Sequence, residues 1–464
     1  MSRLIVVSNR VQTPTQGPAG NQGGLAVGLQ AALRAQGGIW FGWSGEVTDR
    51  FSGEIHYQQG GGVTTATIDL EQQDVEEYYD GYANRTLWPL FHYRIDLTEF
   101  ERDFDSGYGR VNRRFAETLY PLIERDDLVW VHDYHMIPLG AELRRLGCPN
   151  RIGFFLHIPW PPADMLLSLP SHAKLSEALF HYDVVGFQTQ DWLDNFLHYV
   201  ERQLGGTIGE DGIVTVGNRS IRAIAVPIGI DAEAFEAAGR AKTAAFTQER
   251  MYLSATGRML IVGVDRLDYS KGLEERFLGF GRFLQLHPDR QGLVYMLQIA
   301  PPSRETVDTY QSIRARLDSL SGSINGEYSD IDYVPIRYVN KGFGRDALAG
   351  IYRAARVGLV TPLRDGMNLV AKEYVAAQDP ADPGVLILSR FAGAAAQLKD
   401  ALLVNPYSPE ELSDVIGQAL EMPLRERIAR WEALVDNVRR EDISWWRDRF
   451  LAALAGAAAP REAA

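Results

Sequence analysis

The segment MLIVGVDRLDYSKGLEERFLGFGRFLQLH, residues 259–287, passes from an apolar strand through a polar turn into an amphipathic helix. The apolar run covers residues 259–264 and ends at Arg266. The apolar positions of the following helix are Leu273, Phe277, Phe280 and Leu284. Their spacing of four, three and four residues is the period of a helix with one buried face. A strand that leads directly into such a helix is the repeating unit of a parallel α/β sheet.

The same alternation of short apolar runs and helical segments extends along the chain. Strands are expected at residues 4–8, 128–132, 152–157, 184–189, 260–264, 293–299, 357–361 and 385–389. Runs such as GFFL and VLIL are apolar at every position, so we expect both faces of these strands to be covered by helices. The sequence therefore predicts an α/β protein built from doubly wound parallel sheets.

The alternation is interrupted at residues 226–246, VPIGIDAEAFEAAGRAKTAAF, where a weakly patterned, alanine-rich helix precedes a new strand. We therefore predict a first domain over residues 1–235 and a second over residues 236–440. The segment 441–456 contains DISWWRDRFLAAL, a helix with one apolar face, and residues 457–464 are expected to form a frayed tail.

Composition excludes several classes of partner. The chain has 464 residues and a formal net charge of −13, so nucleic acid and anionic membrane surfaces are not expected partners. No apolar stretch is long enough to span a bilayer, and MSRLIVVSNR is interpreted as a first strand and not as a signal peptide. The single cysteine, Cys148, excludes an internal disulfide and indicates a free thiol in a reducing cytoplasm.

An anion site is predicted at the turn that opens the segment quoted above. Arg266 and Lys271 flank the start of a helix near Gly272. Backbone N–H groups at a helix start favour an anion, and two cations beside them strengthen the site. A diphosphate would fit there. Surface ion pairs with Asp265 and Asp268 are the alternative, and the local spacing does not separate the two interpretations.

The segment TPLRDGMNLVAKEY, residues 361–374, has the same organisation. Gly366 allows an unusual backbone conformation and close approach of a ligand. The backbone amides that would be free donors in the first helical turn belong to Met367, Asn368, Leu369 and Val370. Glu373 is a fitting acceptor for the hydroxyls of a ribose. A plain helix start capped by Asp365 is the alternative.

Polar residues follow several predicted strands directly, where open α/β sheets bind their ligands. These residues are Arg10, Asp133, His157, Arg266, Arg304 and Asp365. They come from both halves of the chain, so a cleft between two domains would gather them. His132, Asp133 and His135 lie together on a strand-to-helix turn without an HExxH helix, which favours a sugar-binding carboxylate over a metal site. A structural role is the alternative for His157.

Two further segments are candidates for ligand binding. The loop SNRVQTPTQGPAGNQGGLAVGL places Gly23 and Gly24 at a helix start, but it is not the GxGxxG fingerprint of dinucleotide enzymes. Aromatic residues gather in GGIWFGWSGE and EEYYDGYANRTLWPLFHY, where they could stack on sugar rings or could simply pack in the core. No GxSxG or P-loop motif is present, which argues against hydrolases and P-loop phosphotransferases.

These motifs resemble the trehalose-6-phosphate synthases, which are retaining glycosyltransferases of the GT-B fold. The segments that carry the resemblance are SRLIVVSNR, GGLAVGL, WFGWSGE, LWPLFHYR, VWVHDYH, NRIGFFLHIPWP, VDRLDYSKGL, QIAPPSR and TPLRDGMNLVAKEYVAAQ. They extend from residue 2 to about residue 450. The resemblance implies two Rossmann-like domains facing a cleft, with the C-terminal helix crossing back to the first domain. It also implies a first domain for the acceptor and a second for the donor.

The resemblance implies transfer of glucose from a nucleotide-diphosphate-glucose, with UDP-glucose expected but the base left open, to glucose 6-phosphate. Donor-binding residues would be Gly23, Gly24, Arg266, Lys271, Phe343, Asp365, Gly366, Met367, Asn368, Leu369, Val370 and Glu373. Acceptor-binding residues would be Arg10, Trp40, Tyr79, Trp88, Asp133 and Arg304, with Trp40 the weakest candidate. The residues implied in catalysis are Asp133, His157, Arg266 and Lys271, with His157 on the transferred glucose.

The family needs no metal or other cofactor, and its members often form dimers or tetramers, so a homo-oligomer in the cytoplasm is expected. Three alternatives share the fold: a polymer-extending glucosyltransferase, a pseudo-glycosyltransferase that couples cyclitol phosphates, and a catalytically silent metabolite sensor.

Overall fold

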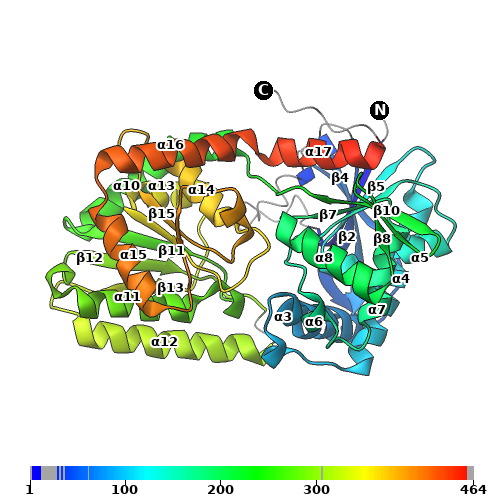
Figure 1. The fold of residues 1–464 in the computed structure, drawn as a ribbon, viewed down its shortest axis with the longest axis horizontal. Helices are drawn as coiled ribbons and strands as arrows, with labels where there is room; N and C mark the ends of the chain where they lie inside the picture. The colour runs from blue at the N-terminus through cyan, green and yellow to red at the C-terminus, as the bar shows by residue number, and fades with distance from the viewer. Residues whose placement is uncertain are drawn as a thin grey trace. The chain divides into compact units, whose positions relative to one another are not determined.

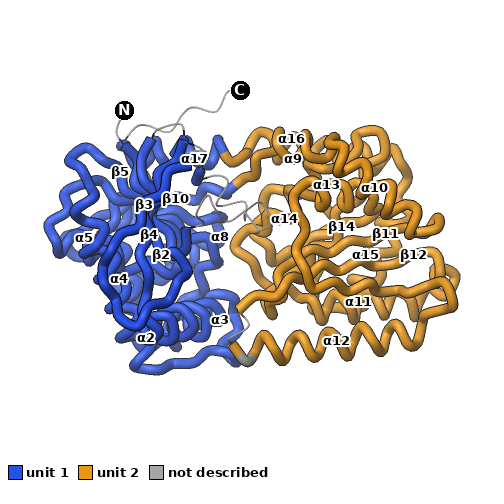
Figure 2. The backbone as a smooth tube through the Cα atoms, turned by 180° about the vertical axis from the view of Figure 1, so that it is seen from behind, with its two compact units in different colours: residues 1–17, 22–228, 444–464 blue, residues 18–21, 229–443 orange. Residues whose placement is uncertain are grey.

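The computed structural model describes residues 3–11, 29–30, 33–34, 37–60, 62–304 and 307–456. The chain divides into two compact units, which Figure 2 colours separately. Unit 1 comprises residues 1–17, 22–228 and 444–464, and unit 2 comprises residues 18–21 and 229–443. The expected limit at residue 235 falls inside helix α9 (Ala232–Gly239), which packs on other helices of unit 2 and groups with them.

Unit 1 is built on a ten-stranded sheet with the order β3-β4-β2-β1-β5-β6-β7-β10-β9-β8. Its strands are β1 (Leu4–Arg10), β2 (Gly38–Thr48), β3 (His56–Gly60), β4 (Val63–Glu71), β5 (Leu128–His132), β6 (Ile152–Phe155), β7 (Val184–Phe187), β8 (Thr207–Ile208), β9 (Ile213–Val216) and β10 (Arg219–Ala225). The strands from β4 to β10 in this order all pair in parallel, whereas β3, β9 and β8 add antiparallel edges.

The helical segments of unit 1 connect these strands. They are α2 (Gln72–Asp74), a π-helix η1 (Val75–Leu87), α3 (Trp88–Phe91), η2 (Ile95–Leu97), α4 (Arg102–Leu119), η3 (Tyr120–Leu122), η4 (Tyr134–Met136), α5 (Leu139–Arg145), α6 (Ala163–Leu166), α7 (His172–Ala178), η5 (Leu179–His181) and α8 (Gln190–Gln203). A π-helix of this length is uncommon, and such segments occur often at functional sites.

The C-terminal helix α17 (Ile443–Ala455) packs on the sheet of unit 1 from residue 444 onward. The rings of Trp446 and Phe450 lie 4.9 and 4.8 Å from the ring of Trp130 on β5. Glycines at Gly153 and Gly186 make room for Phe450, because a Cβ at either position would lie within 3 Å of its ring. The two glycines therefore set how closely the helix approaches β6 and β7.

Unit 2 is built on a six-stranded sheet, β13-β12-β11-β14-β15-β16, in which every pair is parallel. Its strands are β11 (Met259–Val264), β12 (Val294–Ile299), β13 (Ile336–Val339), β14 (Val357–Val360), β15 (Val385–Ser389) and β16 (Leu402–Val404). Its helical segments are α9, α10 (Lys242–Ala255), η6 (Tyr269–Lys271), α11 (Leu273–Leu286), η7 (Pro288–Arg290), α12 (Asp308–Tyr328), α13 (Arg345–Ala354), α14 (Leu369–Ala377), η8 (Gly393–Ala396), α15 (Pro409–Glu421) and α16 (Leu424–Arg440). Helices α11, α12 and α15 cover one face, and α10, α13, α14 and α16 cover the other (Figure 1).

Both sheets have the doubly wound strand order. In unit 2 the strands run 3-2-1-4-5-6 when numbered along the chain, and the parallel strands of unit 1 begin with the same order. The order reverses between β11 and β14 in unit 2 and between β1 and β5 in unit 1. The prediction of two doubly wound parallel sheets is therefore confirmed. Ligands of such sheets bind beyond the carboxyl ends of the strands at this reversal.

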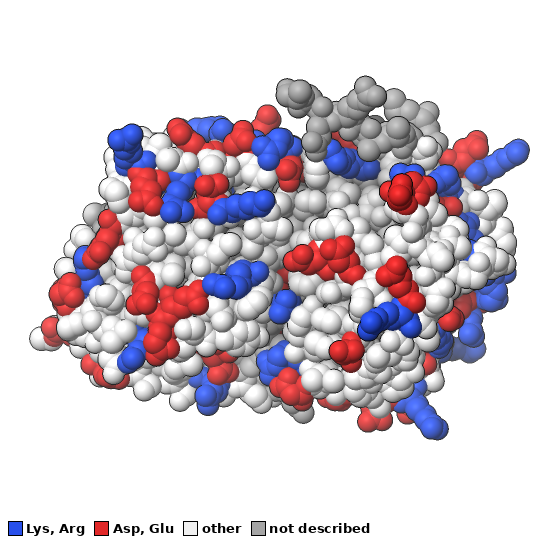
Figure 3. Space-filling model, in the orientation of Figure 1, with Lys and Arg blue, Asp and Glu red and all other residues white. Residues whose placement is uncertain are grey.

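On the face shown in Figure 3, Lys and Arg side chains are scattered among Asp and Glu side chains. Across the described residues, no helix is both long enough and apolar enough to cross a bilayer.

Candidate functional site

Unit 2 brings two loops together at the reversal point of its sheet. We call residues 265–272 the β11 loop and residues 361–368 the β14 loop, after the strands that precede them. The backbone N–H of Leu363 donates to the carbonyl of Ser270 at 2.8 Å, which joins the loops directly. The residues predicted to bind a diphosphate and those predicted to offer helix-start amides therefore lie side by side.

Lys271 lies at the amino end of helix α14. Its Nζ is 2.5 Å from Oδ2 of Asp365, and the two side chains are only 10% and 13% exposed. Asn368, with φ +76°, is the N-cap of α14 and accepts a hydrogen bond from the N–H of Ala371. The alternative that Asp365 caps this helix is therefore wrong, because its carboxylate pairs with Lys271 instead. A cation at a helix N-terminus is the arrangement that an anionic ligand requires.

The β14 loop is fixed in place by helix η8 behind it. The N–H of Gly393 donates to the carbonyl of Asp365 at 3.1 Å, and the N–H of Ala394 donates to the carbonyl of Met367 at 2.8 Å. A Cβ at Gly393 would lie 2.0 Å from the carbonyl oxygen of Gly366, so glycine is required there. Met367 is buried, and Leu369 and Val370 begin helix α14.

The two carboxylates that flank Arg266 are buried. Asp265 is 6% exposed and pairs with Nη1 of Arg276 at 2.8 Å, while Asp268 is 0% exposed and pairs with Nη1 of Arg304 at 3.2 Å. The alternative of surface ion pairs therefore does not hold for these carboxylates. Burial raises the pKa of Asp265, although the charges of Arg276 and Lys271 act against this.

Arg276 is a structural residue of the site that the sequence interpretation missed. Its side chain is 0% exposed, and it donates from Nε to Thr361 Oγ1 at 3.0 Å and from Nη1 to Gln298 Oε1 at 2.8 Å. Together with the ion pair to Asp265, these bonds join the carboxyl ends of β11, β12 and β14. The sequence does contain a sign of this role. Arg276 is three residues after Leu273, so it is a charged residue on the apolar face of the helix.

Two further candidates for donor binding lie in unit 2. Glu373 follows one turn into α14, and burial raises its pKa to about 7, with Arg345 acting in the opposite direction. A carboxyl group that titrates near neutral pH can both accept and donate hydrogen bonds to a diol. Phe343 lies in the loop between β13 and α13, with Nζ of Lys341 5.4 Å from its ring centroid.

Gly272→Ala is expected to destabilise unit 2. Gly272 has φ +64°, and a Cβ there would lie 2.3 Å from the carbonyl oxygen of Thr361. We expect a loss of at least about 3 kcal/mol in the free energy of unfolding, because the clash adds to the cost of about 1–2 kcal/mol for a left-handed residue. Denaturant titration measures it. Gly292→Ala is the matched control, because Gly292 has φ +77° and open space around it. Equal losses in the two variants would contradict the predicted clash.

In unit 1, Asp133 follows β5 at the reversal point of the sheet. It is a non-glycine residue with φ +75°, a strained conformation that the surrounding structure must hold in place. Its Oδ1 accepts hydrogen bonds from the N–H of Tyr134 at 3.0 Å and from the N–H of His157 at 3.2 Å. The structure therefore brings together Asp133 and His157, which are 24 residues apart in the chain.

His157 belongs to a buried chain of hydrogen bonds. Gln188 accepts from the N–H of Ile228 through Oε1, so its Nε2 donates to Nδ1 of His157 at 3.1 Å. His157 must then carry its proton on Nε2 and donate it to Nδ1 of His132, also at 3.1 Å. Burial lowers the pKa of His157 to about 3, and burial followed by the charge of His157 lowers the pKa of His132 well below its usual range. Both rings are therefore neutral at physiological pH.

The buried histidines predict loss of stability in acid. Both bind a proton in the unfolded chain below about pH 6.5 but not in the folded protein, so unfolding is favoured as the pH falls below that value. We expect the free energy of unfolding to fall by about 1.4 kcal/mol per pH unit for each histidine between pH 6.5 and pH 4.5. His132→Gln should reduce the slope measured by denaturant titration. The exposed His198→Gln is the control, and an equal change of slope in both variants would contradict the assignment.

Two of the residues expected to bind the acceptor, Arg10 and Tyr79, lie in an aromatic cluster near the end of β1. The exposed Arg10 has its guanidinium 5.5 Å from the ring centroid of Trp43, whose ring lies 5.5 Å from that of Tyr79. Tyr79, on the π-helix, stacks on His135 with ring centroids 6.0 Å apart. Trp40 and Trp43 are both buried, 2% and 4% exposed, and the indole N–H of Trp40 donates to Ser8.

The tryptophan beside Arg10 is Trp43, which the sequence interpretation did not name as a candidate. Trp40 and Trp43 are three residues apart on one strand, so their side chains point to opposite faces of the sheet. This spacing could have shown from the sequence that the two tryptophans have different surroundings. Trp88 ends the π-helix and is buried against His92 and Tyr134, with ring centroids 4.1 and 5.7 Å away.

Three remaining candidates fall elsewhere. Gly23 and Gly24 lie outside the described residues. Arg304, expected to bind the acceptor, lies in unit 2, where it contacts the β11 loop through Asp268. No group of three or more His, Cys, Asp or Glu residues suited to a metal is found within the described part of the chain.

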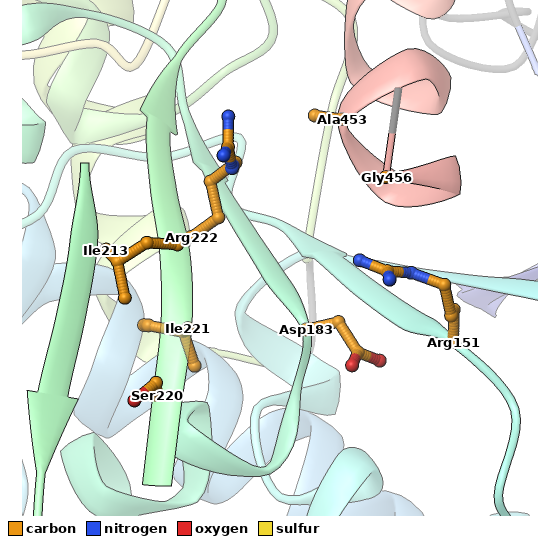
Figure 4. Close-up of a pocket in the computed structure, with 8 residues that line it drawn as sticks. All are labelled: Arg151, Asp183, Ile213, Ser220, Ile221, Arg222, Ala453 and Gly456. Atoms are coloured by element: carbon orange, nitrogen blue, oxygen red, sulfur yellow. The ribbon is translucent and has the colours of Figure 1, made fainter. Parts of the chain in front are cut away.

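A pocket of about 250 Å³ on unit 1 contains none of the predicted residues (Figure 4). It is lined by Arg151, Asp183, Ile213, Ser220, Ile221, Arg222, Ala453 and Gly456. Arg151 and Asp183 directly precede β6 and β7, so this pocket lies at the amino ends of those strands. It is therefore separate from the reversal point, where the candidate site lies.

Two doubly wound sheets, with cations and helix-start amides at the reversal point of one of them, fit a GT-B glycosyltransferase that uses a nucleotide sugar. The model of glycosyltransferase family 20 matches residues 2–456 of this chain. The chain therefore belongs to glycosyltransferase family 20, and the resemblance to trehalose-6-phosphate synthases inferred from its motifs is confirmed.

Individual relatives support this assignment. The trehalose-6-phosphate synthase of Sinorhizobium fredii (strain NBRC 101917 / NGR234) is 50% identical over 97% of this chain and 98% of its own length. The alpha,alpha-trehalose-phosphate synthase (UDP-forming) from Burkholderia xenovorans, solved in complex with glucose-6-phosphate, matches with a TM-score of 0.94 and 47% identity over 98% of this chain and all of the other. An E. coli structure described as bound with UDP-2-fluoro glucose matches with a TM-score of 0.93 and 44% identity over 99% of this chain and all of the other.

Proposed function

We propose that this glycosyltransferase transfers glucose from UDP-glucose to glucose 6-phosphate and forms α,α-trehalose 6-phosphate with retention of the anomeric configuration. The observation that carries the proposal is the position of Lys271 at the amino end of α14, beside the exposed Arg266. Membership of the family and the ligands of the B. xenovorans and E. coli relatives support it.

The donor binds to unit 2 in this proposal. Arg266 and Lys271 neutralise the diphosphate, and the backbone amides at residues 367–370 donate to its oxygens. Glu373 accepts hydrogen bonds from the hydroxyls of the ribose. Asp365, Gly366 and Phe343 complete the donor contacts, together with Gly23 and Gly24.

Charge on the departing diphosphate drives the proposed mechanism. As the bond between the anomeric carbon and the phosphate oxygen breaks, negative charge builds on that oxygen, next to fixed cations that stabilise the transition state more than the ground state. The same oxygen accepts the proton of the attacking acceptor hydroxyl on the same face of the sugar. UDP leaves with that proton, and the new glycosidic bond keeps the original configuration. A double displacement would need a second carboxylate about 5–5.5 Å from the first, and the motif VWVHDYH contains no acid besides Asp133.

The acceptor is held by charge-assisted bonds from Arg10 and Arg304 to its phosphate. Asp133 accepts hydrogen bonds from the hydroxyls of the acceptor, and Tyr79 and Trp88 supply aromatic surface for its sugar ring. Both ring nitrogens of His157 are engaged by His132 and Gln188, so we assign its contact with the transferred glucose to its main-chain carbonyl. Trp40 remains the weakest acceptor candidate, because it is buried and its indole N–H donates to Ser8.

The test is release of nucleoside diphosphate by the purified protein, with UDP-, GDP- and ADP-glucose each offered with glucose 6-phosphate, with glucose, and with no acceptor. The expected result is release of UDP only when glucose 6-phosphate is present. Equal release with glucose, or release without an acceptor, would contradict the proposed acceptor site. No release with any pair would favour a silent sensor or a cyclitol-coupling enzyme, neither of which the comparisons support.

The proposal has three further parts, and the first two have their own measurements. The reaction needs no metal, so an excess of EDTA should leave the rate unchanged. We also propose a homo-oligomer, a dimer or tetramer, which light scattering measures. A cytoplasmic location, where the lone and buried thiol of Cys148 would stay reduced, completes the proposal.

A further inference from the structure

Asp268 is a buried carboxylate in the β11 loop to which the mechanism above gives no role. Its side chain is 0% exposed, and it caps the short helix η6, which ends at Lys271. Oδ1 accepts a hydrogen bond from the N–H of Ser270 at 2.9 Å. A buried charge is costly unless it is paired and hydrogen-bonded, so the partners of the second oxygen indicate what the carboxylate does.

The second oxygen of Asp268 holds Arg304. Nη1 of Arg304 lies 3.2 Å from Oδ2, and the hydroxyl of Tyr310 donates to the same oxygen at 3.1 Å. Nη1 also donates to the hydroxyl of Tyr310 at 2.5 Å, so the three groups form a closed triangle. The side chain of Arg304 is only 6% exposed, and Tyr310 is 1% exposed.

The backbone around this triangle is also constrained. The N–H of Leu267 donates to the carbonyl of Pro301 at 2.9 Å, which ties the β11 loop to the segment after β12. Arg304 itself has φ +51°, an uncommon conformation for a residue with a side chain. Such backbone strain persists only where the surrounding structure enforces it. The side chain of Arg304 is in turn held by its bonds to Asp268 and Tyr310.

Asp268 interacts electrostatically with three cations that the proposed function assigns to the two substrates. Burial alone would raise its pKa, but the charges of Arg304, Arg266 and Lys271 and the hydrogen bond from Ser270 bring it to about 2. The carboxylate is therefore ionised at any physiological pH. Two of these cations are assigned to the donor diphosphate and one to the acceptor phosphate.

We propose that Asp268 is a positioning residue that aims Arg304 at the phosphate of the acceptor and, through the same carboxylate, fixes the turn that carries Lys271. The proposal rests on the function proposed above and deepens it. A guanidinium has five N–H donors in a rigid plane, so fixing Nη1 fixes the direction of the other donors. The hydroxyl of Tyr310 supports this geometry because it bonds to both Arg304 and Asp268.

The first test is the preference of Asp268→Asn for glucose 6-phosphate over glucose, measured as the ratio of the two kcat/KM values. Asparagine keeps the shape and removes the charge, so Arg304 loses its charge-assisted bond and its fixed direction. We expect the ratio to fall by about 10-fold or more, through a higher KM for glucose 6-phosphate. A purely structural defect would lower both kcat/KM values together, and an unchanged ratio would overturn the proposal.

The second test is a double-mutant cycle with Arg304→Gln. If Asp268 acts on the acceptor through Arg304, the double variant should have nearly the same preference for glucose 6-phosphate as Arg304→Gln alone. Full additivity of the two losses would overturn this part. Binding of UDP alone, measured by calorimetry, should weaken about 5-fold or more in Asp268→Asn and stay unchanged in Arg304→Gln. Unchanged UDP affinity in Asp268→Asn would overturn the link to the Lys271 turn.

Two further variants guard against a folding defect. Tyr310→Phe keeps the ring and removes one corner of the triangle, so its ratio should fall by a smaller factor, about 3-fold. Asp332→Asn is the matched control, because it breaks an exposed carboxylate–arginine pair in the same unit, with Arg258 at 2.8 Å. A loss of preference in the control equal to that in Asp268→Asn would overturn the proposal. Wild-type UDP release with glucose 6-phosphate tests the proposed function separately.

Discussion

Lys271→Ala is expected to lower kcat by about 10³-fold, and Arg266→Ala by about 10²–10³-fold. Removal of a single hydrogen-bond donor aimed at developing charge costs a comparable factor in other enzymes. The loss should be larger for Lys271, because its ammonium also neutralises the carboxylate of Asp365 at 2.5 Å. Without the lysine, that carboxylate would face the diphosphate as an unpaired like charge.

Initial rates at saturating glucose 6-phosphate measure this loss, and UDP calorimetry separates ground-state binding from turnover. Adding Asp365→Asn to Lys271→Ala should restore part of the UDP affinity, because it removes the like charge. The exposed Lys242→Ala and Arg425→Ala are the matched controls and should keep the wild-type rate. Near-normal turnover in both single variants would exclude the two cations from the reaction.

Arg10→Gln is expected to lower kcat/KM for glucose 6-phosphate by about 100-fold, with little change for glucose. A charge-assisted bond between an arginine and a phosphate is worth about 1.5–3 kcal/mol, which corresponds to this range. The guanidinium of Arg10 packs beside the ring of Trp43. It occupies space that only a glycine at position 45 leaves open, because a Cβ there would lie 2.2 Å from it. A pre-positioned cation loses little entropy on binding.

Steady-state kinetics with both sugars measure this selectivity. The exposed Arg50→Gln in the same unit is the control and should keep the wild-type ratio of kcat/KM values. If Arg10→Gln lost activity equally on glucose and on glucose 6-phosphate, the residue would serve the fold or the sugar and not the phosphate.

The interior of both sheets could be predicted because fully buried parallel strands are apolar at every position. The predicted strands at residues 128–132 and 385–389 match β5 and β15 residue for residue. Strand β2 was not predicted, because its aromatic and glycine-rich sequence was considered only as a surface for sugar stacking or as core packing. The antiparallel edge strands β3, β8 and β9 and the parallel strands β4, β10, β13 and β16 were missed as well, since each is partly exposed and all except the three-residue β16 contain polar residues.

The residues of the candidate site could be found because ligand-binding side chains follow the ends of strands and occur in continuous motifs. The sequence alone placed Arg266, Lys271 and the β14 loop together as candidates. It could not find Arg276 as a structural centre, nor the chain from Gln188 through His157 to His132. These depend on contacts between residues far apart in the sequence, which local spacing does not report.

The sequence by itself determined the doubly wound fold, the family and the chemical type of each site residue, because hydrophobic period and strand-end motifs are local properties. Only the tertiary structure decided which carboxylate each cation meets. Lys271 pairs with Asp365, 94 residues away, and Arg304 pairs with Asp268, 36 residues away, although Asp265 and Asp268 are the nearer acids to Lys271 in the chain. Pairing follows burial and the direction of side chains at the ends of the strands, and those are fixed only when the sheet assembles.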